Sequence, residues 1–189
     1  MKVVLDDVAP PVIRVVDVRT DIRLERLHTT LQAALGWMDC HLWEFRAGGA
    51  EWGMPDPDWS DGPRDAAATT LRKVLAETGA ETLTYLYDFG DGWKHTIDVV
   101  RIGDAVSGTE YPVLVEASGR CPPEDVGGPW GYAEFLEAVA DPGHERHEEF
   151  KEWCRGDFDP LDVPLDGLKS QVGSLAANWT RTPRKRKAK

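Results

Sequence analysis

The chain has 189 residues, 41% of them hydrophobic, which is enough for one domain with a buried core and too few for two full domains. The formal net charge of the whole chain is −11, so the chain before its last nine residues is a poor candidate for binding duplex nucleic acid, which is also negative. No stretch approaches the ~20 apolar residues of a membrane-spanning helix, the N-terminus has acids where a signal peptide is apolar, and the three separated cysteines form no CxxC pair. We therefore expect a cytoplasmic protein with no membrane partner and no disulfide framework.

The N-terminal third predicts a strand followed by a helix. Residues 12–18 are β-branched and apolar, which is typical of a strand. Apolar residues between positions 22 and 35 recur at spacings of three and four, which indicates an amphipathic helix. Thr20 or Asp21 can cap the start of this helix, and Gly36 ends it.

The middle of the chain predicts short strands around one more helix. Residues 41–52 indicate two strands joined by a Gly-Gly turn. Residues 64–77 are rich in alanine and leucine and predict a helix. Residues 85–99, YLYDFGDGWKHTIDV, have the pattern of a β-hairpin, and residues 111–117 add another strand.

The last part of the chain predicts a loop followed by helices. Residues 121–131, CPPEDVGGPWG, contain too much proline and glycine for a regular element. Residues 132–142 and 144–154 predict two helices, and a third is expected from about Leu168 onward. Because strands and helices occur without a regular βαβ alternation, we predict a single α+β domain, residues 1–180, with a mostly antiparallel sheet and helices packed on it.

The hairpin combines two aspartates with a histidine. If Asp91 and Gly92 form a two-residue type I′ turn, Asp88 lies across from His95. A carboxylate beside an imidazole fixes its tautomer and suits a general base or a metal ligand. A shift of the turn by one residue would instead place Tyr87 opposite His95. The structural alternative is that Asp88 caps the turn and His95 makes an internal hydrogen bond.

Four sequence blocks together resemble a known family. They are the hairpin block YLYDFGDGWKHTIDV, LERLHTTLQAALGWMDCHLWEF at residues 24–45, CPPEDVGGPWGYAEFLEAVADP at residues 121–142, and FDP at residues 158–160. In this order they are similar to the plasmid pRi-type ORF-three-like family over roughly residues 12–165. The resemblance implies an α+β fold and a setting on plasmids and mobile elements, with some members labelled as insertion-element passenger proteins of the TnpR type. It implies no reaction.

The shared blocks contain oxygen and nitrogen ligands of the kind that divalent metal ions prefer. We call the loop that begins with CPPED at residue 121 the CPPED loop. If it folds over the hairpin, a metal-dependent hydrolase site results, with Asp88, His95 and Glu124 as candidate catalytic residues. Asp88, Asp91 and His95 are then the candidate ligands of a divalent metal ion, and that ion is the only cofactor the sequence suggests.

The same region also supports a second hypothesis, that of a binding or accessory module. The hairpin and the CPPED loop would form a recognition surface for a protein or peptide partner, while their polar groups hold the loops in place. We expect six residues to contribute to this surface: Asp91, Trp93, Asp125, Trp130, Tyr132 and His41.

The C-terminal nine residues differ in charge from the rest of the chain. Arg181 to Lys189, RTPRKRKAK, contain six basic side chains and no acid, so the body that precedes them is more acidic than the whole chain. Such a segment can neutralise nucleic-acid phosphates, which makes nucleic acid a possible partner. The alternative is a disordered, solubilising tail at residues 181–189.

Overall fold

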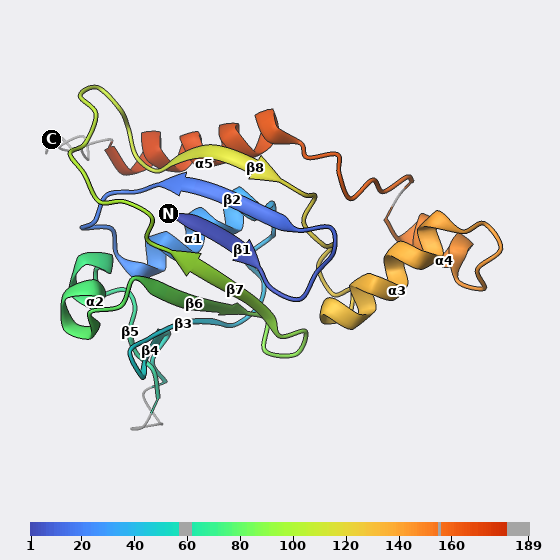
Figure 1. Cartoon of the computed structure of the whole chain (residues 1–189), viewed down its shortest axis with the longest axis horizontal. Coiled ribbons are helices and arrows are strands. Elements are labelled where there is room, and N and C mark those ends of the chain that lie inside the picture. The colour runs from blue at the N-terminus through green and yellow to red at the C-terminus, as the bar shows by residue number, and fades with distance from the viewer. Residues whose placement is uncertain (57–61, 155, 181–189) are drawn as a thin grey trace, which may run out of the picture.

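The computed structural model describes residues 1–56, 62–154 and 156–180, which fold around one eight-stranded sheet (Figure 1). The predicted basic tail, residues 181–189, lies outside this part of the chain. The strands follow the order β5-β4-β3-β6-β7-β1-β2-β8, and all neighbours are antiparallel except β4 and β5. Their bounds are β1 Lys2–Leu5, β2 Val12–Asp17, β3 Trp43–Ala47, β4 Ala50–Gly53, β5 Arg64–Asp65, β6 Thr82–Tyr87, β7 Trp93–Asp98 and β8 Val113–Ser118.

Helices cover this sheet and extend beyond it. Their bounds are α1 Leu24–Leu35, α2 Leu71–Thr78, α3 Gly128–Ala140, α4 His147–Trp153 and α5 Leu165–Thr180. Helix α1 crosses behind the sheet, α5 runs along β8, and the α3–α4 pair lies beyond the end of the sheet where the β6–β7 hairpin turns (Figure 1). The predicted α+β fold is therefore confirmed. None of the helices in the described ranges is long and apolar enough to cross a membrane.

Helix α1 forms where the apolar spacing predicts it. Leu24, Leu27 and Leu31 are fully buried, and Gly36 ends the helix in the left-handed conformation. The prediction that Thr20 or Asp21 caps its start is wrong, because the residue at the cap position lies further along the chain and no side chain caps it. Asp21 instead pairs with the Arg19 guanidinium on the surface.

The hairpin has a different register from the one that we predicted. Tyr87 lies opposite Trp93 and Tyr85 lies opposite His95, so the turn comprises residues 88–92. The predicted pairing of Asp88 with His95 is therefore wrong. The observed register places the aromatic rings and His95 together on the buried face, and burial of that face sets strand register more strongly than a preferred turn sequence.

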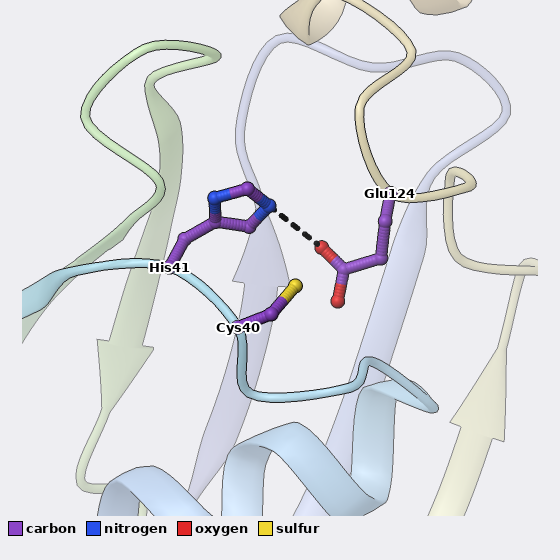
Figure 2. Close-up of side chains that lie close together, drawn as sticks. All are labelled: Cys40, His41 and Glu124. Carbon is purple, nitrogen blue, oxygen red and sulfur yellow. Dashed lines mark ion pairs between the residues drawn. The ribbon is translucent and has the colours of Figure 1, made fainter.

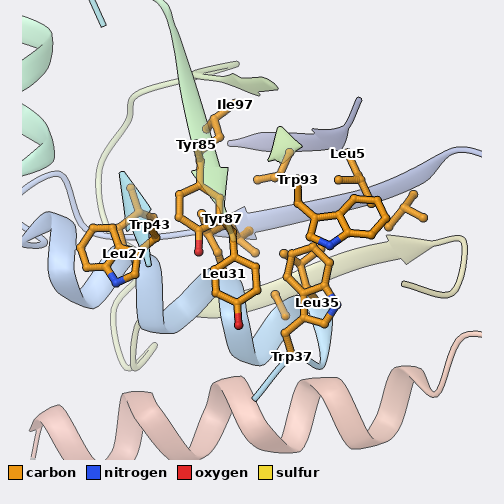
Figure 3. Packing of buried hydrophobic residues seen from close by; sticks show 14 of the residues in the cluster. Leu5, Leu27, Leu31, Leu35, Trp37, Trp43, Tyr85, Tyr87, Trp93 and Ile97 are labelled. Atoms are coloured by element: carbon orange, nitrogen blue, oxygen red, sulfur yellow. The ribbon is translucent and has the colours of Figure 1, made fainter. Parts of the chain in front are cut away.

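This buried face is the centre of the core (Figure 3). The Trp37 ring stacks on Tyr87 at a centroid distance of 5.0 Å and meets His95 edge-on at 5.4 Å. His95 is fully buried, and its Nδ1 donates to the Tyr85 carbonyl at 3.2 Å. Burial lowers the pKa of His95 to about 4, because a charged imidazole there would lose its water. His95 is thus a core residue.

A second buried histidine, His28, also has a lowered pKa. His28 stacks on Trp43 at 4.1 Å and lies between Tyr85 Oη at 2.7 Å and Asp39 Oδ1 at 2.6 Å. Burial lowers the pKa of His28, although the contact with Asp39 opposes that shift. Both histidines therefore favour the neutral form in the folded protein.

We predict that the protein loses stability as the pH falls from 6.5 toward 4. The unfolded chain takes up a proton at His95 near pH 6.5, whereas the folded chain does so only near pH 4. The free energy of unfolding should therefore rise with pH across this window, by about 3 kcal/mol from His95 alone. Urea denaturation at several pH values measures this slope.

The variant His95→Gln removes the titrating group and should flatten the slope in this window. The matched control is His144→Gln, since His144 is only partly buried in the loop between α3 and α4. A slope that is the same in the parent and in His95→Gln would contradict the prediction.

Candidate functional site

The CPPED loop lies against both the hairpin and the end of α1. The Trp37 indole Nε1 donates to the Pro122 carbonyl at 2.9 Å, and the Gly127 N–H donates to Asp91 Oδ2 at 3.1 Å. The loop lacks regular structure, so these side-chain contacts supply hydrogen bonds that a strand or helix would otherwise provide. Segments far apart in the sequence are thereby joined at one junction.

Three carboxylates surround one imidazole at this junction. His41 Nε2 lies 3.6 Å from Asp88 Oδ2, 3.7 Å from Glu124 Oε2 and 3.2 Å from Asp125 Oδ1. Figure 2 shows His41 and Glu124 pointing toward each other, with Cys40 beside them. Asp88 and Glu124 are largely buried, whereas the side chain of Asp125 is 69% exposed. We call His41, Asp88, Glu124 and Asp125 the His41 cluster.

Backbone groups hold the two buried carboxylates in place. Asp88 adopts a positive φ of 55°, and its Oδ1 accepts from the Gly90 N–H at 3.0 Å. Glu124 Oε1 accepts from the Met38 N–H at 2.7 Å. In each case one oxygen is fixed by the backbone, and the other oxygen is the one nearest to His41.

Tyr87 holds the Glu124 carboxylate in place through a hydrogen bond. The Tyr87 hydroxyl donates to Glu124 Oε1 at 3.2 Å and accepts from the Cys40 N–H, also at 3.2 Å. Burial raises the pKa of Tyr87 far above its ordinary value, and the Glu124 carboxylate adds to this shift. The phenol therefore stays protonated and acts as a hydrogen-bond donor to the carboxylate.

The spacing of the His41 cluster fits the coordination sphere of one divalent ion. Bonds of ~2.0 to 2.2 Å place neighbouring ligand atoms about 3 to 3.6 Å apart, which is close to the separations around His41 Nε2. The ligand atoms form two overlapping triplets within 4.8 Å, one with Asp88 and Asp125 and one with Cys40 and Glu124. Nitrogen, oxygen and sulfur donors together favour Zn²⁺ or Mn²⁺ over Mg²⁺.

The structure separates the predicted site residues into three groups. His41, Asp88, Glu124 and Asp125 come together, and Asp91 anchors the loop beside them. His95, Trp93 and Tyr132 are buried, so they pack the core and offer no contact surface. Trp130 is 90% exposed at the start of α3.

Sequence reasoning missed two contributors to the site. One is Cys40, and the signal for it is the adjacent pair Cys40 and His41 just before a strand, which combines two metal-ligand types. The other is Tyr87, whose hydroxyl contact with Glu124 depends on a loop that is distant in the sequence. Only the fold could reveal that second contact.

The fold and the junction define a small α+β protein with an open sheet and a charged, loop-built site at one end. The chain belongs to the plasmid pRiA4b ORF-3-like protein family, whose model matches residues 1–166. It is 53% identical over 187 residues to the uncharacterized protein y4hQ of Sinorhizobium fredii (strain NBRC 101917 / NGR234), covering 98% of this chain and 96% of y4hQ. A crystal structure of MM3350, a protein of unknown function from Methanosarcina mazei Go1, matches with a TM-score of 0.78 at 30% identity and covers 87% of this chain and 94% of that one.

We predict that Gly128→Ala disrupts the junction. Gly128 has a φ of +69°, and an added Cβ would overlap the Asp91 carbonyl oxygen. The substitution should cost about 1 to 2 kcal/mol for the backbone conformation, with a further ~1 to 3 kcal/mol for the clash. Thermal and urea denaturation of the parent and the variant measure this loss.

Gly92→Ala is the matched control for this experiment. Gly92 lies in the hairpin turn next to Asp91 and has a φ of +71°, but an added Cβ there would meet no atom within 4 Å. It should therefore show only the cost of the backbone conformation. Equal destabilisation by the two substitutions would show that the close approach of the loop and the hairpin contributes nothing.

Proposed function

We propose that the protein is a recognition module that binds a protein or peptide partner at the junction of the hairpin and the CPPED loop. The observation that carries this proposal is the exposure of Trp130, which is 90% accessible within a few residues of the CPPED loop. A large aromatic side chain gains more from burial in a partner than any other type, and tryptophan is enriched among the residues that dominate binding energy.

Other exposed apolar side chains flank the same charged cluster. Phe89 lies in the hairpin turn next to Asp88, and Leu42 precedes β3 and accepts the Asp88 N–H through its carbonyl. Met38 is exposed and donates its N–H to Glu124. These exposed apolar side chains support a binding surface, since isolated exposed hydrophobic residues are common but grouped ones mark binding sites.

The proposed setting is that of an accessory protein of plasmids or other mobile elements. The description of the family names a plasmid reading frame, which supports this setting at a coarse level. The basic residues 181–189 lie outside the described part of the chain, and we retain them as a proposed contact for nucleic acid because of their charge. In this arrangement the junction binds the partner and the tail contributes salt-sensitive affinity.

We predict that Trp130→Ser abolishes capture of the partner without unfolding the protein. The tagged parent and variant are incubated with lysate of the source organism, and the retained proteins are quantified by mass spectrometry. A hot-spot tryptophan contributes ~2 kcal/mol or more, so recovery of the specific partner should fall roughly 30-fold. The melting temperature should remain within error, because Trp130 is exposed in the free protein.

The matched control is Ile102→Ser, which removes an exposed hydrophobic side chain that is 63% accessible. Ile102 lies in the segment between β7 and β8, and β7 ends at the opposite end of the sheet from α3 (Figure 1). It should leave recovery unchanged. If Trp130→Ser and the parent retain the same proteins in the same amounts, the junction is not the recognition surface.

A second candidate function is metal-dependent hydrolysis at the His41 cluster. One specific observation favours it: His41 Nε2 is buried and makes no hydrogen bond within the described chain, although three carboxylates lie within 4 Å. Carboxylates gathered this closely repel one another unless a cation lies between them. A divalent metal ion would supply that charge.

The arrangement of the cluster suits a metal that activates water. His41, Asp88 and Asp125, whose ligand atoms lie within 4.8 Å of one another, would hold the ion, while the Gly90 N–H orients Asp88 from outside. The exposed Asp125 marks the open side, where a metal-bound water could attack a substrate. In this hypothesis His41 replaces His95 as the histidine of the site.

We predict that Zn²⁺ or Mn²⁺ stabilises the metal-stripped parent, by ~2.7 kcal/mol when the free ion is at 100 times its Kd. His41→Ala and Asp125→Asn should each weaken binding by at least roughly tenfold, because each removes a ligand. Asp125→Asn should leave the metal-free stability unchanged, since this side chain is exposed. Isothermal titration and thermal denaturation measure the two quantities.

His144→Ala is the control, since it removes a histidine outside the cluster. Hydrolysis of bis(p-nitrophenyl) phosphate by the metal-loaded parent separates the two functions. Metal binding with turnover that both ligand variants lose supports the enzyme, and metal binding without turnover leaves a recognition module with a structural ion. Equal metal affinity in the parent and His41→Ala would rule out the site.

A further inference from the structure

A cavity lies on the other side of the CPPED loop from the His41 cluster. It has a volume of about 490 Å³, within the range of small-molecule sites, and lies between the end of α1, the loop after β8, the end of α4 and the start of α5. Apolar side chains form much of its wall, notably Trp37, Trp153, Phe158 and Leu168. Glu124 and Asp125 of the His41 cluster also line it.

A buried arginine faces this cavity. Arg14 on β2 is 1% exposed and lines the cavity wall. Its Nε donates to the Ala34 carbonyl at 2.7 Å, and its Nη1 contacts the Ser118 and Gly119 carbonyls at 2.9 and 3.0 Å. The guanidinium is therefore held rigidly by backbone oxygens at the point where β2 and β8 diverge.

The charge of Arg14 has no acidic partner within the described ranges of the chain. No carboxylate there forms an ion pair with it, and its Nη2 donates to no protein atom. Backbone carbonyls offset part of the cost of burying a cation, but an uncompensated buried charge remains expensive. Burial accordingly lowers the pKa of Arg14, with a small opposing effect from Cys121.

Arg120 adds a second positive charge to the same cavity. It lines the wall, its guanidinium lies 4.4 Å from the centre of the Phe158 ring, and it forms no ion pair with any described carboxylate. Arg14 and Arg120 therefore both line this one cavity. Two arginines and an apolar wall together favour a ligand with one anionic group and one apolar part.

We propose that this cavity is a binding site for a small organic anion. Its carboxylate or phosphate group accepts hydrogen bonds from Arg14 Nη2 and the Arg120 guanidinium, and its apolar body packs against Trp153 and Phe158. The acids Glu124 and Asp125, which also line the cavity, repel a second negative group, so the site selects ligands with a single negative group. The inference does not rest on the proposed function, because neither arginine belongs to the His41 cluster or to the surface around Trp130.

The test uses the whole chain in buffer with EDTA, so that no metal at the His41 cluster contributes. Phenyl phosphate and benzoate are the anionic probes, benzamide is the neutral analogue of benzoate, and inorganic phosphate is the anion without an apolar body. Binding is followed by tryptophan fluorescence, since Trp37 and Trp153 line the cavity, and by heteronuclear NMR. At least one of the two aromatic anions should bind at least tenfold more tightly than benzamide and inorganic phosphate, and the stronger of the two identifies the preferred anionic group.

Substitutions locate the site on the molecule. Arg14 donates hydrogen bonds to the Ala34, Ser118 and Gly119 carbonyls, so its replacement risks unfolding, and Arg120→Gln is the informative variant. It should weaken the aromatic anion roughly tenfold, whereas Arg101→Gln, which removes an exposed arginine from the loop after β7, should have no effect. Equal binding of benzoate and benzamide, no binding of either aromatic anion, or equal losses in Arg120→Gln and Arg101→Gln would overturn the proposal.

Discussion

The burial of one aromatic face of the β6–β7 hairpin is the constraint on which the rest of this structure depends. Tyr85, Tyr87 and Trp93 are fully buried together with His95, and Trp37 from the end of α1 packs on them. This packing fixes the strand register, and the register in turn places Asp88 in the turn beside His41. It also brings the Tyr87 hydroxyl to the surface of the core, where it meets Glu124. Hydrophobic packing therefore positions the polar site.

The CPPED loop converts this packed hairpin into a junction with two different sides. On one side Glu124 and Asp125 complete a group of carboxylates around His41. On the other side Arg120 and the buried Arg14 line an apolar cavity. A loop of a few residues thus separates a negative region from a positive one, and each region has the charge that would attract the opposite kind of ligand. Because the loop is held by side-chain contacts, occupancy of either side can affect the other.

The relation between the His41 cluster and the exposed apolar residues bears on both candidate functions. A cation at His41 would neutralise the carboxylates and tie the hairpin to the loop, which would make the surface around Trp130 and Phe89 more rigid. A rigid surface loses less conformational entropy when a partner binds. The same cation would be a Lewis acid for hydrolysis if water reached it on the Asp125 side. The residues of the His41 cluster would therefore make a binding surface rigid in the first function and hold a metal that activates water in the second.

The sequence by itself determined the α+β class, the amphipathic helix α1, the paired strands β3 and β4, and the importance of the hairpin and the CPPED loop, because these features follow from local periodicity, turn residues and family-specific motifs. It did not determine which histidine belongs to the site. The preferred two-residue turn predicted His95 as the histidine of the site. Burial of the aromatic face instead sets a different strand register, in which His95 lies in the core. The approach of His41 to Glu124, and of Arg14 to the Ser118 and Gly119 carbonyls, joins segments that are far apart along the chain. Such contacts arise only when the tertiary structure brings those segments together, since no local pattern encodes a distance between them.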